Sequence, residues 1–138
     1  MRYYPVNLDV KGKRCVVVGG GEVAARKAEV LVRAGAKVKV ISPFLVPRLK
    51  RLLGEGRIEH IRRRYKKGDL KGAFLAFIAT DDEMMNRRAS RDASPRTLVN
   101  VADKPSECDF TLPSIIERGD VLIAVSTGGH SPAMAKHI

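Results

Sequence analysis

Three consecutive glycines, Gly19, Gly20 and Gly21, are the first residues of this chain whose spacing points to chemistry. They follow an apolar run and precede a segment of helical periodicity, and Ala24 completes a G-x-G-x-x-A motif. Glycine allows a tight turn and a close approach of backbone to ligand, and a helix that begins there presents unpaired N–H groups and a positive dipole end. The pattern predicts a pyrophosphate-binding turn rather than an ordinary strand-to-helix turn.

Polar residues end a second apolar run, 73–79, which is typical of a central parallel strand. Thr80 and Asp81 follow this run directly. Because ligands of doubly wound sheets lie over the carboxyl ends of the strands, we expect Thr80 and Asp81 beside a bound dinucleotide. An alternative is that Asp81 or Asp82 caps the next helix, and both interpretations can hold at the same strand end.

A third run, 98–102, ends at the carboxylate of Asp103. At the ligand edge of the sheet, Asp103 is our candidate proton acceptor, with Val101 expected near the cofactor. Two other roles stay open. Asp103 can orient a substrate while solvent takes the proton, or it can be a turn or helix-cap residue.

These residues can form one site only if a sheet brings the strand ends together. Apolar strand-like runs alternate along the chain with segments of helical periodicity, as such a sheet requires. This alternation predicts a Rossmann-like α/β fold, a parallel sheet with helices on both faces, in one 138-residue chain. Expected strands are 15–18, 37–41, 58–65, 73–80, 98–103 and 121–126; expected helices are 23–32, 47–53 and about 83–90, and 110–120 leads to a turn.

The end of the second strand departs from the simple dinucleotide pattern. An acidic residue usually binds the adenosine ribose there, but this chain has Ser42 and Pro43. A serine hydroxyl can still bond a ribose hydroxyl, and the missing carboxylate reduces repulsion of a 2′-phosphate. The residues alone leave NAD and NADP as alternatives.

The formal charge of +11 at pH 7 narrows the class of partner. It suits nucleic acid, a solvated basic face or a small anionic substrate, and we rank nucleic acid last because no nucleic-acid motif is visible. No apolar run approaches the roughly 20 residues of a membrane span, so we expect no membrane contact and a cytoplasmic protein. Cys15 and Cys108 lack ligand spacing, as do His60, His130 and His137; we expect plain thiols and no metal site.

Taken together, the motifs resemble a known family. From about Tyr4 to Ala135, in the same order and spacing, the chain is similar to precorrin-2 dehydrogenase, the NAD-binding part of sirohaem synthase. Five segments carry the resemblance: 17–27, 79–82, 100–103, 112–116 and 125–132.

The resemblance implies NAD-dependent oxidation of precorrin-2, an anionic tetrapyrrole, to sirohydrochlorin, with insertion of ferrous iron as a further activity of some members. It implies a homodimer with an NAD-binding domain at 1–112, followed at 113–138 by a dimerisation segment and the start of a shortened C-terminal helical region. Members of the family continue into a helical segment that helps to cover the tetrapyrrole, and we expect full turnover to need it.

Site residues follow from the same resemblance. Glu22 and Val23 match cofactor contacts of the glycine turn, Pro43 and Phe44 match contacts at the second strand, and Asp103 matches the catalytic aspartate. If iron is inserted, the macrocycle nitrogens bind it and Asp103 accepts protons.

A second glycine-rich turn is the candidate contact for substrate carboxylates, through hydroxyls and backbone N–H groups. An equally good interpretation is that its glycines are structural. Its residues are Ser126, Thr127, Gly128 and Gly129. A rival function for the whole chain is a regulatory NAD-binding module without catalysis.

Overall fold

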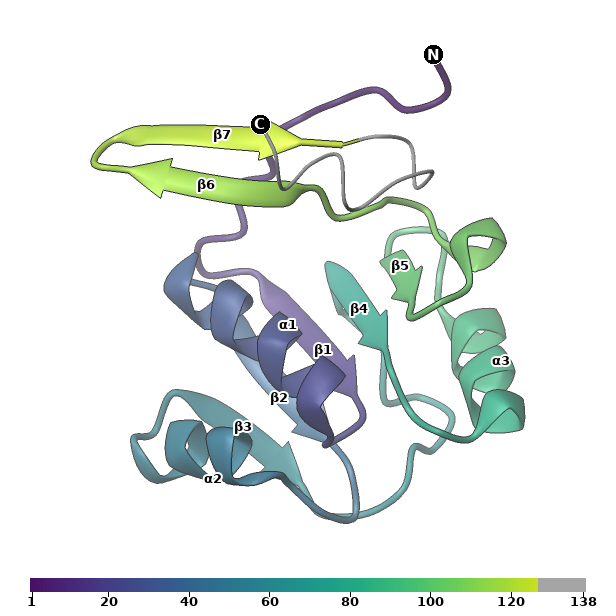
Figure 1. Ribbon diagram of the computed structural model, residues 1–138. Helices are drawn as coiled ribbons and strands as arrows, with labels where there is room; N and C mark the ends of the chain where they lie inside the picture. The colour runs from purple at the N-terminus through teal and green to yellow at the C-terminus, as the bar shows by residue number, and fades with distance from the viewer. Residues whose placement is uncertain (127–138) are drawn as a thin grey trace. The chain divides into compact units, whose positions relative to one another are not determined.

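The computed structural model describes residues 1–126, which divide into two units, Asp9–Phe110 and residues 1–8 with 111–126. The first unit is a five-stranded, all-parallel sheet in the order β3-β2-β1-β4-β5, shown in Figure 1. This confirms the predicted Rossmann-like α/β fold. Its elements are β1 (Arg14–Val18), α1 (Glu22–Arg33), β2 (Lys37–Ile41), α2 (Pro47–Gly54), β3 (Ile58–Ile61), β4 (Leu75–Ile78), α3 (Glu83–Asp92), β5 (Leu98–Val101) and the short 3₁₀ helix η1 (Pro105–Glu107).

β1 lies at the centre of the sheet because both of its faces are apolar. Its β-branched valines suit an extended backbone, and alternate side chains point to opposite faces. Cys15 and Val17 belong to one hydrophobic cluster, whereas Val16 and Val18 belong to the other. The register places Val17 beside Val40 of β2 and Phe77 of β4. The sheet therefore separates two hydrophobic cores and contributes side chains to both.

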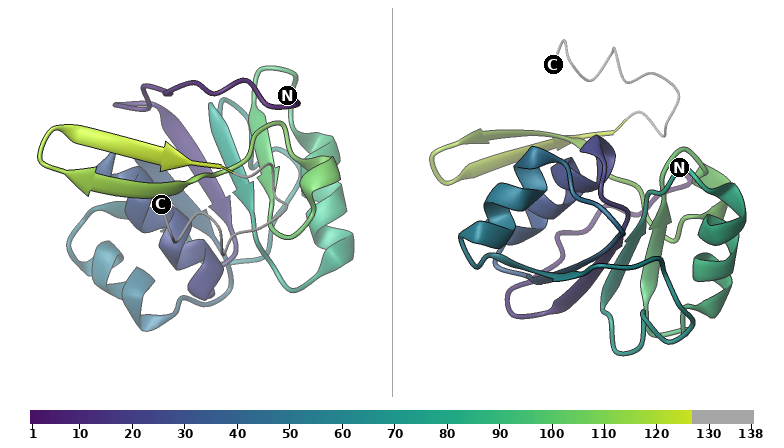
Figure 2. Two further views of the ribbon diagram at one scale, coloured as in Figure 1. Left: turned by 45° about the horizontal axis from the view of Figure 1, so that its top comes forward. Right: turned by 90° about the horizontal axis from the view of Figure 1, so that it is seen from below.

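Helices cover both faces of this sheet (Figures 1 and 2). α1 packs three small residues, Ala24, Ala25 and Ala28, into the first cluster, which lets its backbone approach the strands closely. α2 adds Leu49 and Leu52 to the same cluster. α3 packs Ala89 against the second cluster on the other face.

The largest differences from the predicted strands are at β3 and β4, and β5 also ends early, at Val101 rather than residue 103. β3 ends at Ile61 rather than continuing to residue 65, because the Arg63 N–H turns back to the Ile61 carbonyl at 3.0 Å and the Arg63 side chain makes two bonds with Asp69. β4 begins at Leu75 and ends at Ile78, which leaves Ala79 and Thr80 in the loop that follows.

The second unit contains an antiparallel hairpin, β6 (Ser114–Arg118) and β7 (Val121–Val125). The sequence predicted β7 but gave only a lead into a turn where β6 lies, and that assignment was wrong. Arg118 pairs with Val121 across a two-residue loop in which Gly119 has φ 59°. A Gly-Asp pair between two apolar runs is a hairpin signal that could have identified β6. Within residues 1–126, every helix is too short or too polar to cross a membrane.

Candidate functional site

The candidate site lies where the strand order reverses. β1 has β2 on one side and β4 on the other. From β2 the chain continues outward to β3 at one edge of the sheet, and from β4 it continues outward to β5 at the opposite edge. Ligands of such sheets bind in the crevice beyond the carboxyl ends of the strands at this switch point. The glycine turn after β1, and the segments after β2, β4 and β5, all begin at this edge of the sheet.

Two of the three glycines are required by packing between these segments. Gly19 has φ 131°, and its N–H donates to the Ile41 carbonyl at 2.9 Å. A Cβ on Gly19 would overlap the backbone of Ala79, and a Cβ on Gly20 would overlap the Phe44 carbonyl. The first two glycines therefore let the ends of β1, β2 and β4 come together.

The third glycine has a different role. A Cβ on Gly21 would meet nothing within 4 Å, and Gly21 begins α1 without a side-chain cap. The first N–H groups of a helix are unsatisfied unless a side chain, water or a ligand binds them. This open, uncapped start of α1 fits an anionic group such as a pyrophosphate.

Two predicted cofactor residues follow directly on Gly21. Glu22 and Val23 are both exposed. The Glu22 carboxylate would repel an anion, but Arg48 of α2 pairs with it at 3.2 Å and with Glu29 at 2.6 Å. Glu29 holds the pKa of Arg48 above its ordinary value, with Glu22 contributing, so the guanidinium stays charged beside the turn. Arg48 therefore offsets the negative charge of Glu22.

After β2, the three predicted residues are not equivalent. Ser42 is 3% exposed, and its hydroxyl accepts a hydrogen bond from the Phe44 N–H at 3.3 Å. The Ser42 carbonyl accepts a bond from His60 Nε2 at 2.8 Å, so His60 has a structural contact. Pro43 and Phe44 are exposed. These two, rather than Ser42, present side-chain surface beyond the strand end.

After β4, Thr80 and Asp82 form a network with Asn86 of α3, which the sequence analysis did not single out. The Thr80 hydroxyl bonds the Asn86 side-chain carbonyl and accepts from the Asp82 N–H. Asp82 caps α3, since its carboxylate accepts the Met85 N–H at 3.1 Å. Asp81 is exposed. The capping alternative thus holds for Asp82 and leaves Asp81 available to solvent.

After β5, Asp103 has a left-handed backbone with φ 61°. It is the one non-glycine residue with positive φ in the described part of the chain. Its side chain is exposed, whereas the Val101 side chain is 2% exposed and lies in the core on the α3 face. The Val101 side chain therefore belongs to the core, and its backbone N–H and carbonyl are bonded within the chain, by Cys108 and Lys104.

Lys27 of α1 is a further charged group at this edge that the sequence analysis missed. Burial, reinforced by Arg26, lowers the pKa of the half-buried Lys27, and the acidic groups of Asp103 and Cys108 partly counter that shift. Lys27 is thus within electrostatic reach of Asp103. Its place on α1 one turn beyond Val23 was the signal for it.

The four remaining predicted residues are not part of the Asp9–Phe110 unit. Ser126 ends the described chain in the second unit, while Thr127, Gly128 and Gly129 lie outside the described residues. Across residues 1–126, no three or more His, Cys, Asp or Glu side chains gather into a metal-binding group.

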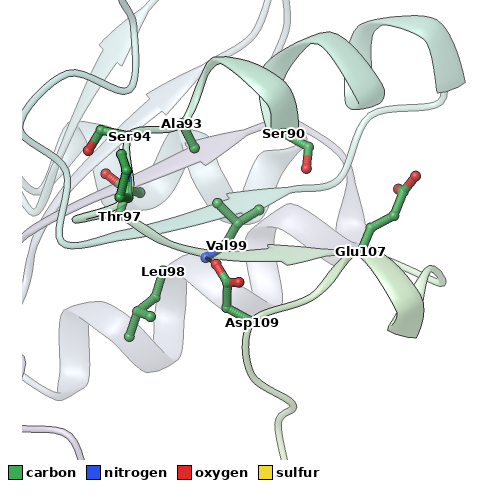
Figure 3. Close-up of a pocket in the computed structure, with 9 residues that line it drawn as sticks. Ser90, Ala93, Ser94, Thr97, Leu98, Val99, Glu107 and Asp109 are labelled. Carbon is green, nitrogen blue, oxygen red and sulfur yellow. Dashed lines mark hydrogen bonds between the residues drawn. The ribbon is translucent and has the colours of Figure 1, made fainter.

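A hollow of about 340 Å³ lies beside β5 and the end of α3 and contains none of the predicted site residues. Figure 3 shows Asp109 beside Val99, with Glu107 farther along the same segment. Its lining residues are Ser90, Ala93, Ser94, Pro95, Thr97, Leu98, Val99, Glu107 and Asp109.

Comparison with known proteins gives concordant matches. Residues 6–114, well over half of the chain, match the model of a family described as "Putative NAD(P)-binding". A solved structure of SirC, precorrin-2 dehydrogenase, superposes with a TM-score of 0.88 at 30% identity over 98% of this chain and 67% of that one. This chain belongs to the precorrin-2 dehydrogenase family.

Other members of the family are longer than this chain. The siroheme synthases of Methylobacillus flagellatus and Nitrosococcus oceani are 45% and 44% identical to it, each over 137 residues and 99% of its length. The chain spans 29% of the length of each. The family match includes the whole Asp9–Phe110 unit, in which the glycine turn and Asp103 lie.

Proposed function

We propose that this chain binds NAD and dehydrogenates precorrin-2 to sirohydrochlorin, with Asp103 as the proton acceptor. The observation that carries the proposal is that Asp103 follows β5 at the same sheet edge as the uncapped start of α1. Membership of the precorrin-2 dehydrogenase family and the likeness to SirC support the substrate.

The glycine turn would hold the cofactor. The unpaired N–H groups at the start of α1 would bind its pyrophosphate, with Gly21 leaving room for it. Pro43 and Phe44 would contact the adenosine end, and Thr80 and Asp81 would lie beside the crevice. Backbone and apolar surface thus replace the usual ribose-binding carboxylate.

The reaction removes two hydrogens from a reduced tetrapyrrole. NAD, when bound, supplies the hydride acceptor. The chain must supply a proton acceptor, and the Asp103 carboxylate is exposed and able to take that role. If ferrous iron is also a substrate, the macrocycle nitrogens would be its ligands and Asp103 would accept the displaced protons.

The test is anaerobic turnover of precorrin-2 with NAD, followed by the absorbance of sirohydrochlorin. Asp103→Asn removes the charge but tolerates the left-handed backbone, so it separates chemistry from folding. Asp9→Asn is the matched control, because Asp9 is exposed and its carboxylate accepts only the nearby Lys11 N–H, at 3.2 Å, among the bonds of the described chain.

We expect Asp103→Asn to lose about 100-fold or more in kcat while NAD affinity is kept, and Asp9→Asn to match the unmutated protein. Full turnover by Asp103→Asn would remove Asp103 as the base. NAD binding without any binding of tetrapyrrole would favour the regulatory module instead.

We also propose that the protein is a cytoplasmic homodimer whose hairpin joins two copies. The hairpin exposes large apolar side chains, and such patches mark association sites. Ile115, Leu122 and Ile123 are 48%, 54% and 44% exposed. Leu122→Asp should give a monomer by light scattering, with Arg118→Ala as a control. The free thiols of Cys15 and Cys108 agree with a reducing compartment.

A further inference from the structure

The thiol of Cys108 bonds both ends of the turn that carries Asp103. Its sulfur accepts the Val101 N–H at 3.2 Å and is 3.2 Å from the Val101 carbonyl. It is also 3.3 Å from the Lys104 carbonyl. Val101 and Lys104 are the first and last residues of the turn, so one side chain spans it.

The backbone of this turn closes through a single bond between the same two residues. The Lys104 N–H donates to the Val101 carbonyl at 3.2 Å. Asp103 occupies the third position with φ 61°, a conformation that costs a non-glycine residue roughly 1 kcal/mol or more. A strained residue keeps such a conformation only where its surroundings hold it, and Cys108 supplies the additional bonds.

The protonation state of the thiol suits this role. Burial is the main cause that raises the pKa of Cys108 above its ordinary value. The thiol therefore keeps its proton near neutral pH and can donate it to the Val101 or the Lys104 carbonyl. Lys27 is within electrostatic reach of both Cys108 and Asp103, which gives the carboxylate a charged neighbour.

We infer that Cys108 is a positioning residue for catalysis, which holds the Val101–Lys104 turn so that the Asp103 carboxylate faces the substrate. This inference rests on the proposed role of Asp103. Cys108 itself touches neither cofactor nor substrate in this scheme. A small misplacement of a reacting group is enough to lower a rate by one to two orders of magnitude.

Two substitutions separate hydrogen bonding from packing. Cys108→Val fills the site with a slightly larger apolar side chain whose β-branch suits the extended backbone at this position, φ −100° and ψ 137°, but it cannot bond the turn. Cys108→Ser restores a donor and an acceptor. Ser106→Ala, an exposed position in η1, controls for substitution in the same loop.

The first readout is steady-state turnover of precorrin-2 with NAD by the full chain. We expect Cys108→Val to lower kcat about tenfold with the KM for NAD within about twofold of the unmutated value, because the glycine turn is untouched. Cys108→Ser should recover most of the loss. A merely structural role predicts lower thermal stability in Cys108→Val with kcat unchanged, which would overturn the inference.

The second readout does not depend on activity. Backbone chemical shifts of Asp103 report its left-handed conformation by NMR. We expect Cys108→Val to shift and broaden the signals of residues 102–104, and Cys108→Ser and Ser106→Ala to preserve them. Unchanged signals in Cys108→Val would refute the positioning role even if the protein oxidised no precorrin-2, whereas an unmutated chain that binds no NAD would refute the proposed function.

Discussion

Asp109 and Val99 bond each other twice along the open edge of β5. The Asp109 N–H donates to the Val99 carbonyl at 2.8 Å, and the Asp109 carboxylate accepts the Val99 N–H at 2.8 Å. We predict that Asp109→Ala lowers the free energy of unfolding by about 1 kcal/mol, since the Val99 N–H loses its acceptor. Asp109→Asn keeps an acceptor oxygen and should lose less. Equal denaturation midpoints for all three proteins would contradict this account.

The glycines of the turn should separate stability from binding. Gly20→Ala introduces a Cβ into the Phe44 carbonyl, so we expect a loss of about 1–3 kcal/mol in unfolding free energy. The methyl group of Gly21→Ala would meet open space, so the substitution should lower the unfolding free energy by no more than about 1 kcal/mol. The same methyl group would occupy the space proposed for the pyrophosphate at the start of α1. Calorimetric titration with NAD should then show at least about tenfold weaker binding for Gly21→Ala. Unchanged affinity would place the pyrophosphate elsewhere.

Asp103 offers a test of stability against function. Glycine adopts positive φ freely, so Asp103→Gly should raise the unfolding free energy by up to about 1 kcal/mol while abolishing turnover of precorrin-2. Asp103→Ala should both lower the unfolding free energy and abolish turnover. Chemical denaturation measured beside the kinetics checks the pair, and a destabilised Asp103→Gly would mean that the carboxylate itself stabilises the turn.

Acid sensitivity should centre on Asp69. Its carboxylate accepts two bonds from Arg63, at 2.7 and 2.8 Å, which hold the pKa of Asp69 below its ordinary value, with the Lys66 N–H contributing. Because the folded pKa is depressed, the stabilisation is present above the ordinary aspartate range near pH 4 and is lost as pH falls through the folded pKa. Asp69→Asn should therefore lower the denaturation midpoint at pH 7, and the deficit should shrink as the pH falls below about 4. Asp9→Asn should show no such convergence.

The positive net charge should increase the rate at which the protein associates with an anionic substrate. A charge of +11 attracts polycarboxylates over distances that salt screens, with a Debye length of about 10 Å at 0.1 M. We predict that kcat/KM for precorrin-2 falls several-fold between about 0.05 and 0.5 M salt while kcat changes little. A flat profile would mean that the basic residues merely solvate the surface.

The sheet was predictable because its signals are local. An apolar run rich in valine identifies β1, alternation of lysine with β-branched residues identifies β2, and alanines at helical spacing identify the face of α1. The hairpin partner β6 was missed because its apolar run is only two isoleucines long and the Gly-Asp turn signal that joins it to β7 was not applied. The spacing of apolar residues indicates strand propensity, whereas the tertiary structure decides which strands pair.

The sequence predicted which residues lie at the strand ends of the site, but not which hydrogen bonds their side chains make. The glycines, Thr80 and Asp103 could be located at strand ends from the sequence. The buried hydroxyl of Ser42 could not, because its bond to the Phe44 N–H depends on how the loop after β2 folds back. The same holds for Lys27, whose relation to Asp103 arises from elements about 75 residues apart brought to one edge of the sheet. It holds also for Cys108, whose bonds to Val101 and Lys104 depend on how the loop after β5 folds back.

The alternation along β1 also governs how this unit comes apart. Cys15 and Val17 line one core and Val16 and Val18 the other, so neither layer of helices can detach without wetting the same strand. The free energies of opening the two faces are thereby linked, and Asp9–Phe110 should melt as one cooperative foldon rather than as two independent halves.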